Sequence, residues 1–365
     1  MRHITARRID EVVSSLPQPE RANDKWASTF VADIVVGAAG FEERCLALPQ
    51  MARGMPGRPA DALFYSYPMN EPENKLRLAE LQAIAQVSFG SFRIVGPNER
   101  DLASELRSLV QSRTRERRPR VLVDISGMSG RLLLFVCRQA LLLDCDLTVF
   151  YAEAAEYRPT QAEFSLQRPH YVENGGLGLE DGIGEVVPSD SAPGENDPSL
   201  PNRVLVLAGF SHTRARAGIS YVDPALVQSA HQVDWILGKP RLARDYWRLE
   251  AARVVHSLEE GQFVELSTSD YRDSVSLFLS EFRKWYSTAN LTVVPLGSKS
   301  QIFGLALSLW SHPEVRAVVA SPSRYSASDY SKGWGTCWAS DLGPTKGLGA
   351  LMRSVGELTL QRGRL

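Results

Sequence analysis

The chain has 365 residues, of which 44% are hydrophobic and 23% charged, as in ordinary globular proteins with room for two domains. Its formal net charge of −1 excludes a broadly basic surface for long nucleic acid. No run approaches the roughly 18 apolar residues that span a bilayer, and the start lacks a signal-peptide core, so we expect a cytoplasmic protein without membrane contact. The cysteines and histidines show no metal-ligand spacing, and no metal or cofactor is expected.

The first part of the chain alternates short apolar strands with amphipathic helices. Residues 1–30 are predicted to form an N-terminal helix and connector, and residues 31–172 a first lobe. Strands are expected at 33–37, 62–67, 92–96, 120–125 and 147–152, with helices near 42–53, 74–87, 100–115 and 131–143. This alternation is typical of a parallel sheet covered by helices on both faces, with right-handed crossovers.

Residues 173–202 are rich in Gly, Pro, Ser and acidic residues and are predicted to be a linker. Residues 203–340 then repeat the scheme as a second lobe, and 341–365 are predicted to form a C-terminal helix. Strands are expected at 204–208, 234–237, 262–267, 291–296 and 316–320, with helices near 242–257, 273–286 and 301–310. After the first of these strands, no clean helix is expected.

The two lobes match in the order and spacing of their landmarks. Gly40 corresponds to Gly209, Pro68 to Pro240 and Phe92 to Phe263 at nearly constant separation. Such a repeat predicts an α/β fold of two tandem Rossmann-like parallel-sheet lobes, produced by internal duplication and related by a pseudo-twofold axis.

Ligands of open parallel sheets bind at the carboxyl ends of the strands, where free backbone amides and helix dipoles attract anions. One such loop is "GAAGFEER", and its second-lobe counterpart is "AGFSHTRAR". The glycines allow tight turns, and Arg214 could bind phosphate. These loops provide the candidate ligand-binding residues Gly37, Gly40, Phe41, Glu42, Arg44, Gly209, His212 and Arg214.

A second pair of loops is "DISGMSGR" and "VPLGSKSQ". Their small residues would leave amides open to a phosphate or a ribose, and Lys299 at a Gly-Ser turn is typical of an anion site. Their candidates are Asp124, Ser126, Gly127, Ser129, Gly130, Arg131, Gly297, Ser298, Lys299, Ser300 and Gln301. Tyr157, Arg324 and Tyr325 are expected to contribute from segments that follow the last strand of each lobe. If the site is catalytic, Lys299, Asp124 and Ser298 are the candidates.

"DISGMSGR" resembles the Asp-Ile-Thr-Gly-Gly-Thr-Lys pattern of CRISPR-associated Rossmann fold (CARF) domains. The two-lobed chain is similar to their fused pairs, the SAVED domains of anti-phage systems. Asp124 to Gly127 follow the pattern, whereas Gly130 stands at the Lys position, and only the second lobe has its lysine, Lys299. The resemblance implies binding of cyclic oligonucleotide messengers between the lobes.

The loops predict a protein that binds a nucleotide-type ligand in the inter-lobe cleft. The resemblance implies that this ligand is a cyclic oligonucleotide and that the protein is a sensor in anti-phage defence, with an effector protein as its partner. One alternative is a nucleotide-processing enzyme, either a ring nuclease or a nucleotide or NAD hydrolase, using the same cleft. Another is a non-catalytic scaffold.

Overall fold

The computed structural model describes residues 2–114, 117–229 and 231–360. They form two compact units. One, here called the seven-stranded unit, consists of residues 17–158 and 327–349. The other, the six-stranded unit, consists of 2–16, 159–326 and 350–360. Across these residues the fold is mixed α/β, with twelve α-helices among them, so the predicted α/β class is confirmed.

The seven-stranded unit contains a parallel sheet with two antiparallel strands at one edge. The spatial order of the parallel strands is β6 (Asp146–Ala152), β5 (Arg120–Asp124), β2 (Ile34–Ala39), β3 (Asp61–Ser66) and β4 (Ser91–Val95). Strand β17 (Cys337–Pro344) runs antiparallel to β6, and β1 (Glu20–Ala22) runs antiparallel to β17. The chain proceeds from β2 to β3 and β4, and then crosses to β5 and β6 on the other side. The strand order therefore reverses between β2 and β5, which makes this the topological switch point of the sheet.

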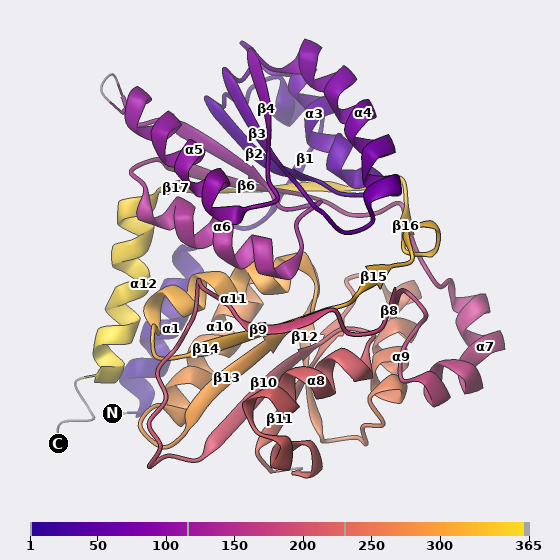
Figure 1. The fold of residues 1–365 in the computed structure, drawn as a ribbon. Helices are drawn as coiled ribbons and strands as arrows, with labels where there is room; N and C mark the ends of the chain where they lie inside the picture. Colours follow the sequence, from indigo (N-terminus) through magenta and orange to yellow (C-terminus); the bar gives the residue numbers. More distant parts are fainter. Residues whose placement is uncertain (1, 115–116, 230, 361–365) are drawn as a thin grey trace. The chain divides into compact units, whose positions relative to one another are not determined.

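Helices cover both faces of this sheet. Figure 1 shows α3 (Ala47–Met51) and α4 (Glu71–Ser88) on one face, and α5 (Glu99–Arg113) and α6 (Gly130–Leu142) on the other. The short α2 (Asp24–Ala27) follows β1. Helix α6 begins after Ser129, whose hydroxyl caps the amide of Leu132. Phe64, Leu122 and Phe150 are fully buried in the core beneath α3 and α4.

The six-stranded unit has the same strand order in its parallel part. The order is β12 (Phe263–Ser267), β11 (Val233–Lys239), β10 (Asn202–Ala208), β13 (Asn290–Pro295) and β14 (Arg316–Ser321), followed by antiparallel β9 (Glu185–Pro188). The chain again fills one side of its first strand, β10, before it crosses to the other. The switch point of this sheet lies between β10 and β13.

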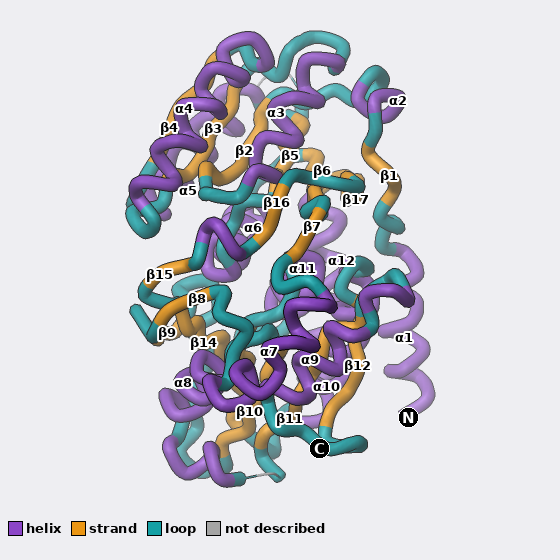
Figure 2. The backbone as a smooth tube through the Cα atoms, turned by 90° about the vertical axis from the view of Figure 1, so that its right-hand side faces the viewer, coloured by secondary structure: helices purple, strands orange, loops and turns teal. Residues whose placement is uncertain are grey.

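Helices α8 (His212–Val222) and α9 (Trp247–Val255) share one hydrophobic core with β10 and β11. Helices α10 (Tyr271–Trp285) and α11 (Lys299–Ser311) pack together, and α1 (Arg2–Ser15) contacts α10 (Figure 1). Helix α7 (Gln161–Asn174) lies beside α9 (Figure 2), where Phe164 and Tyr171 pack on Ala251 and Val255. Helix α12 (Thr345–Leu360) begins in the seven-stranded unit and continues into this one.

Two short antiparallel ribbons complete the fold. In the seven-stranded unit, β7 (Glu156–Tyr157) pairs with β16 (Ser331–Lys332). In the six-stranded unit, β8 (Glu180–Asp181) pairs with β15 (Arg324–Tyr325). Both ribbons are visible in Figure 2. Each brings together segments that are far apart in the sequence.

The ten predicted parallel strands agree with the structure to within two residues at each end. The structure differs elsewhere. Helix α8 occupies the position where no clean helix was expected, and the helix expected near 42–53 is divided into two 3₁₀ turns around α3. The range predicted as a linker contains β8 and β9. The helix expected within residues 1–30 is present as α1, whereas β1 and α2 were not expected there. Parts of the helices expected at 100–115 and 341–365 lie outside the described residues.

Candidate functional site

The predicted loops come together in pairs at the two switch points. In the seven-stranded unit, the loop after β5 contacts the end of β2 so closely that a Cβ on Gly127 would lie 2.6 Å from the carbonyl oxygen of Ala38. In the six-stranded unit, a Cβ on Gly209 would lie 2.5 Å from the carbonyl oxygen of Leu296. Glycine is required at both places because no other residue allows this approach. Each pair of loops therefore forms one continuous edge.

A buried ion pair lies in the loop after β2. Nη2 of Arg44 is 2.8 Å from both carboxylate oxygens of Glu42, and the two side chains are only 4% and 10% exposed. Burial acts to lower the pKa of Arg44. Glu42 and two tyrosines together act more strongly in the opposite direction, so the pKa of Arg44 lies well above its usual range. The two charges neutralise each other inside the protein. Neither is presented to solvent as a charge for a ligand.

Two tyrosines and the β7/β16 ribbon complete the surroundings of this pair. Nη1 of Arg44 donates to the hydroxyls of Tyr151 and Tyr157, at 3.3 and 3.4 Å. Ser331 donates to Glu42 at 2.9 Å, and the amide of Gly333 donates to Glu43 at 3.0 Å. The ribbon is therefore fastened over the loop by hydrogen bonds to both of its acids. Tyr151 and Ser331 are members of this network that the sequence did not indicate.

Asp124 lies at the end of β5, 1% exposed. Burial raises its pKa to about 7, although hydrogen bonds from the hydroxyl and amide of Ser126 and the nearby Arg44 charge oppose the rise. Ser126 is itself fixed, because its hydroxyl accepts the amide of Ala152 at 2.8 Å. The arrangement holds a carboxyl group that changes protonation near neutral pH, which is typical of functional sites but also occurs in structural networks.

The loop before α6 offers fewer open amides than the sequence indicates. The amide of Ser126 donates to Asp124, that of Met128 to the carbonyl of Ile125, and that of Ser129 to the hydroxyl of Tyr67 at 2.7 Å. The first turn of α6, with Gly130 and Arg131, is partly exposed. Arg131 forms an ion pair with Glu99 at 3.2 Å. An anion here would bind beside this ion pair on the first turn of α6.

The corresponding loop of the six-stranded unit is a capping box. The hydroxyl of Ser298 accepts the amide of Gln301 and donates to the carbonyl of Thr268, while the Gln301 side chain accepts the amide of Ser298. Gln301 is fully buried and also donates to Leu266. Gly297 and Lys299 are partly exposed and Ser300 is buried. Ser298 and Gln301 thus stabilise the start of α11, and Lys299 is the first residue of this helix.

At the neighbouring start of α8, Arg214 is held by the protein. Its guanidinium pairs with Glu180 at 2.5 Å and donates to the carbonyl of Ala320 at 2.7 Å. The amide of His212 donates to the carbonyl of Gly175 at 2.7 Å. The segment after α7 therefore covers part of this helix end. Arg214 fixes the β8/β15 ribbon to the sheet in this structure.

His212 meets a histidine that the sequence did not indicate. Its Nδ1 lies 3.4 Å from Nδ1 of His256, and Nε2 of His256 lies 2.9 Å from the carbonyl oxygen of Gly209. Burial lowers the pKa of His256 to about 4, and burial followed by Arg216 lowers that of His212. Because His256 follows α9, far from this loop in the sequence, no local motif could reveal the pair.

The remaining predicted residues are more dispersed. Gly37 lies inside β2 and faces the ring of Phe64, where a Cβ would come within 2.5 Å. Phe41 packs edge-to-face on Tyr330. Arg324 and Tyr325 form β15, in the ribbon with β8. Gly40 is buried beside Gly127.

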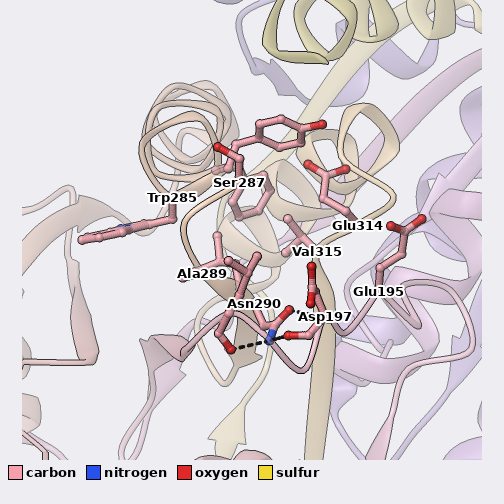
Figure 3. Close-up of a pocket in the computed structure, with 12 residues that line it drawn as sticks. Glu195, Asp197, Trp285, Ser287, Ala289, Asn290, Glu314 and Val315 are labelled. Carbon is pink, nitrogen blue, oxygen red and sulfur yellow. Dashed lines mark hydrogen bonds between the residues drawn. The ribbon is translucent and has the colours of Figure 1, made fainter. Parts of the chain in front are cut away.

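A cavity of about 210 Å³ lies at the opposite, amino-terminal edge of the six-stranded sheet (Figure 3). Asn290, the first residue of β13, is joined there to Asp197 by hydrogen bonds. Glu195 and Glu314 also line the cavity. Its position at the start of β13 separates it from the switch point, and none of the predicted site residues lines it.

No family model matches the chain, and no curated protein matches it. Among solved structures, it is similar to one titled as the cytoplasmic domain of a prokaryotic cation chloride cotransporter. The identity is 10%, the TM-score is 0.25, and the match covers 80% of this chain and 96% of that one. This similarity is too distant to inform fold or function.

Within the part of the chain that the structure describes, no helix is long and apolar enough to cross a bilayer. No group of three or more His, Cys, Asp or Glu side chains suited to a metal occurs in those same ranges.

Proposed function

We propose that the protein is a cytoplasmic sensor that consists of two Rossmann-like lobes derived by duplication and binds a nucleotide-type anion at its switch points. The observation that carries the proposal is topological. The strand order reverses between β2 and β5 and again between β10 and β13, and the predicted loops follow these four strands. Open α/β sheets bind their ligands at this position.

The charges at the two edges support an anionic ligand. The first turn of α6 carries Arg131 and that of α11 carries Lys299, both partly exposed. Phosphate is favoured at a helix start by the dipole and the amides, and a basic side chain adds to this attraction. A cyclic oligonucleotide, with several phosphates, is the ligand that the CARF and SAVED resemblance implies. A role in anti-phage defence, with output through an effector protein, follows from the same resemblance.

Binding can be tested by thermal shift and calorimetry with mononucleotides, cyclic dinucleotides and cyclic oligoadenylates. A ligand at 100 times its Kd stabilises the unit that binds it by about 2.7 kcal/mol. Arg131→Gln and Lys299→Gln are expected to weaken binding about tenfold each, as removal of one phosphate contact does.

Matched controls are available on the same faces. Arg138→Gln changes a partly exposed arginine later in α6, and Lys284→Gln changes a lysine of α10 that pairs with Glu281. Both should bind like the wild type. If no compound of the panel stabilises the protein, or if the site variants bind as tightly as their controls, the proposal is wrong.

One observation favours an enzyme as the second candidate. Asp124, with its pKa raised to about 7, could exchange a proton at neutral pH during hydrolysis of a nucleotide. Chromatography after incubation would then show product, and Asp124→Asn would abolish turnover while leaving binding intact. Binding without product supports the sensor, and product formation supports the enzyme.

A further inference from the structure

The imidazole rings of His212 and His256 lie in contact at the switch point of the six-stranded unit, and their surroundings determine the direction of the hydrogen bond between them. His212 is the first residue of α8, and His256 directly follows α9. The ring of His256 is 3% exposed and packs against Trp235, with ring centroids 4.9 Å apart. One nitrogen of His256 contacts the carbonyl of Gly209 and the other faces His212.

The hydrogen bonds determine which nitrogens carry protons. A carbonyl oxygen only accepts, so Nε2 of His256 must carry the hydrogen that it donates to Gly209. The neutral ring then has its lone pair on Nδ1. His212 must therefore supply the hydrogen between the two rings from its own Nδ1. A neutral His212 therefore has its lone pair on Nε2, the ring nitrogen that does not face His256. The side chain of His212 is partly exposed.

The surroundings keep both rings neutral. The charged or titratable groups that act on His212 are Arg216, on the same helix, and His256, at the end of α9. A positive charge on His212 is opposed by Arg216 and by the amino end of the α8 dipole. The same two effects oppose a divalent cation between the rings, although two imidazoles can ligate one. The arrangement is suited to a neutral acceptor.

We propose that His212 is a neutral hydrogen-bond acceptor at this switch point. His256 positions His212 through the Nδ1–Nδ1 contact, and Nε2 of His212 accepts a hydrogen bond from a hydroxyl of the bound ligand. The close contact of Gly209 with Leu296 brings this loop beside the one that leads to Lys299. A nucleotide carries both chemistries, a phosphate for the basic helix start and a ribose hydroxyl for the imidazole. The ligand part of this inference rests on the proposed function, whereas the state of the two rings does not.

The first experiment needs no ligand. Two-bond ¹H–¹⁵N correlation spectra of the full chain with ¹⁵N-labelled histidine distinguish the two neutral tautomers and the charged form. At pH 7.5 we expect His212 protonated on Nδ1 and His256 on Nε2. His256→Phe removes the acceptor and should return His212 to the Nε2–H tautomer that isolated histidine prefers. His256→Gln can donate to Gly209 and accept from His212, and should restore the wild-type tautomer.

His170→Gln, at an exposed histidine of α7, is the matched control and should change nothing at His212. A wild-type His212 that is charged or Nε2-protonated would overturn the inference, as would one that does not respond to His256→Phe. A Zn²⁺ titration of the same sample should leave the two rings unshifted at equimolar metal. Selective shifts of both rings would show a metal site in place of a hydrogen-bond acceptor.

The ligand part is tested with adenosine 5′-monophosphate and its 2′-deoxy and 3′-deoxy analogues. The wild type should bind one deoxy analogue about tenfold more weakly, and His212→Phe should lose this discrimination but keep the phosphate-dependent part of binding. Wild-type binding that is indifferent to both hydroxyls contradicts this inference but leaves the proposed function standing. Absence of binding by the nucleotides of the full panel contradicts the proposed function, while the tautomers still decide the state of the pair.

Discussion

The two switch points share one topology but hold opposite kinds of buried acid–base group. At the β2/β5 edge, Asp124 is surrounded by protein and its pKa is raised to about 7. At the β10/β13 edge, His256 is equally buried and its pKa is lowered to about 4. In both cases burial is the main cause and favours the neutral form. The order of strands thus determines where such groups lie, while the side chains determine which proton equilibrium results.

The two shifts have opposite consequences for stability. As pH rises from about 4 to 7, an unfolded Asp124 ionises while the folded one stays protonated, so its contribution to stability is lost on the way up. As pH falls from about 6.5 to 4, an unfolded His256 becomes charged while the folded one stays neutral, so its contribution is lost on the way down. Because the chain has two units, both effects are best measured by segment-resolved hydrogen exchange.

The largest effect is expected at the buried ion pair of the β2/β5 edge, which is more deeply buried than the Arg214–Glu180 pair at the other edge. Arg44→Met leaves Glu42 buried without its partner and should destabilise the seven-stranded unit by about 3–5 kcal/mol. Exchange in β2 and β5 reports this loss. The double variant Glu42→Gln/Arg44→Met should recover most of it, whereas the exposed control Arg53→Met should stay within about 0.5 kcal/mol. Equal destabilisation by the single and double variants would contradict the assignment.

Asp124→Asn removes the titrating group of the same edge. The stability difference between variant and wild type should shift in favour of the variant by up to about 4 kcal/mol between pH 4 and 7, at about 1.4 kcal/mol per pH unit. Amide exchange of β5 at several pH values gives the slope. A difference that does not vary with pH would show that Asp124 ionises at its ordinary pKa.

His256→Gln is the matched experiment at the other edge, and the stability difference between variant and wild type should change with pH in the opposite direction. Wild-type stability relative to the variant should fall by about 3 kcal/mol as pH decreases from 6.5 to 4. Exchange in β10, beside Gly209, is the readout, and His170→Gln should show no such slope. The comparison fails if the two edges respond to pH in the same direction.

The smallest effect concerns Tyr67, whose hydroxyl accepts the amide of Ser129 and donates to the carbonyl of Gly127 at 3.3 Å. Tyr67→Phe should cost about 1 kcal/mol. If a phosphate can replace the hydroxyl on that amide, millimolar inorganic phosphate should stabilise the variant more than the wild type in a thermal melt. Equal stabilisation by phosphate would show that the amide is not part of an anion site.

Local patterns accounted for the parallel part of both sheets. The apolar runs that became β2, β5, β10 and β13 are short, bounded by turn residues and followed by glycine-containing loops, and these features are visible in sequence. They also place the loops at the correct edge of each sheet, because the carboxyl end of a strand follows directly from chain direction. The fold class could be predicted for this reason.

The partners of the site residues were not predictable in the same way. Ser331 reaches Glu42, Glu180 reaches Arg214, and His256 reaches His212 across long stretches of sequence. Their own neighbours carry no motif that indicates these contacts. The sequence therefore identified Arg44 and Arg214 as charged loop residues but could not show that each already has an acid within the protein.

The way the two units alternate along the chain has a practical consequence. Strand β17 and the β16 half of its ribbon are supplied to the seven-stranded unit by residues 327–349, after nearly all of the six-stranded unit has been passed. During synthesis on the ribosome, β6 is therefore an unpaired edge strand of the parallel sheet until residues 327–349 have been made. For the same reason, truncating the chain at a single position cannot produce either unit intact. Expressing one unit alone requires a circular permutation or a fusion of its separate segments.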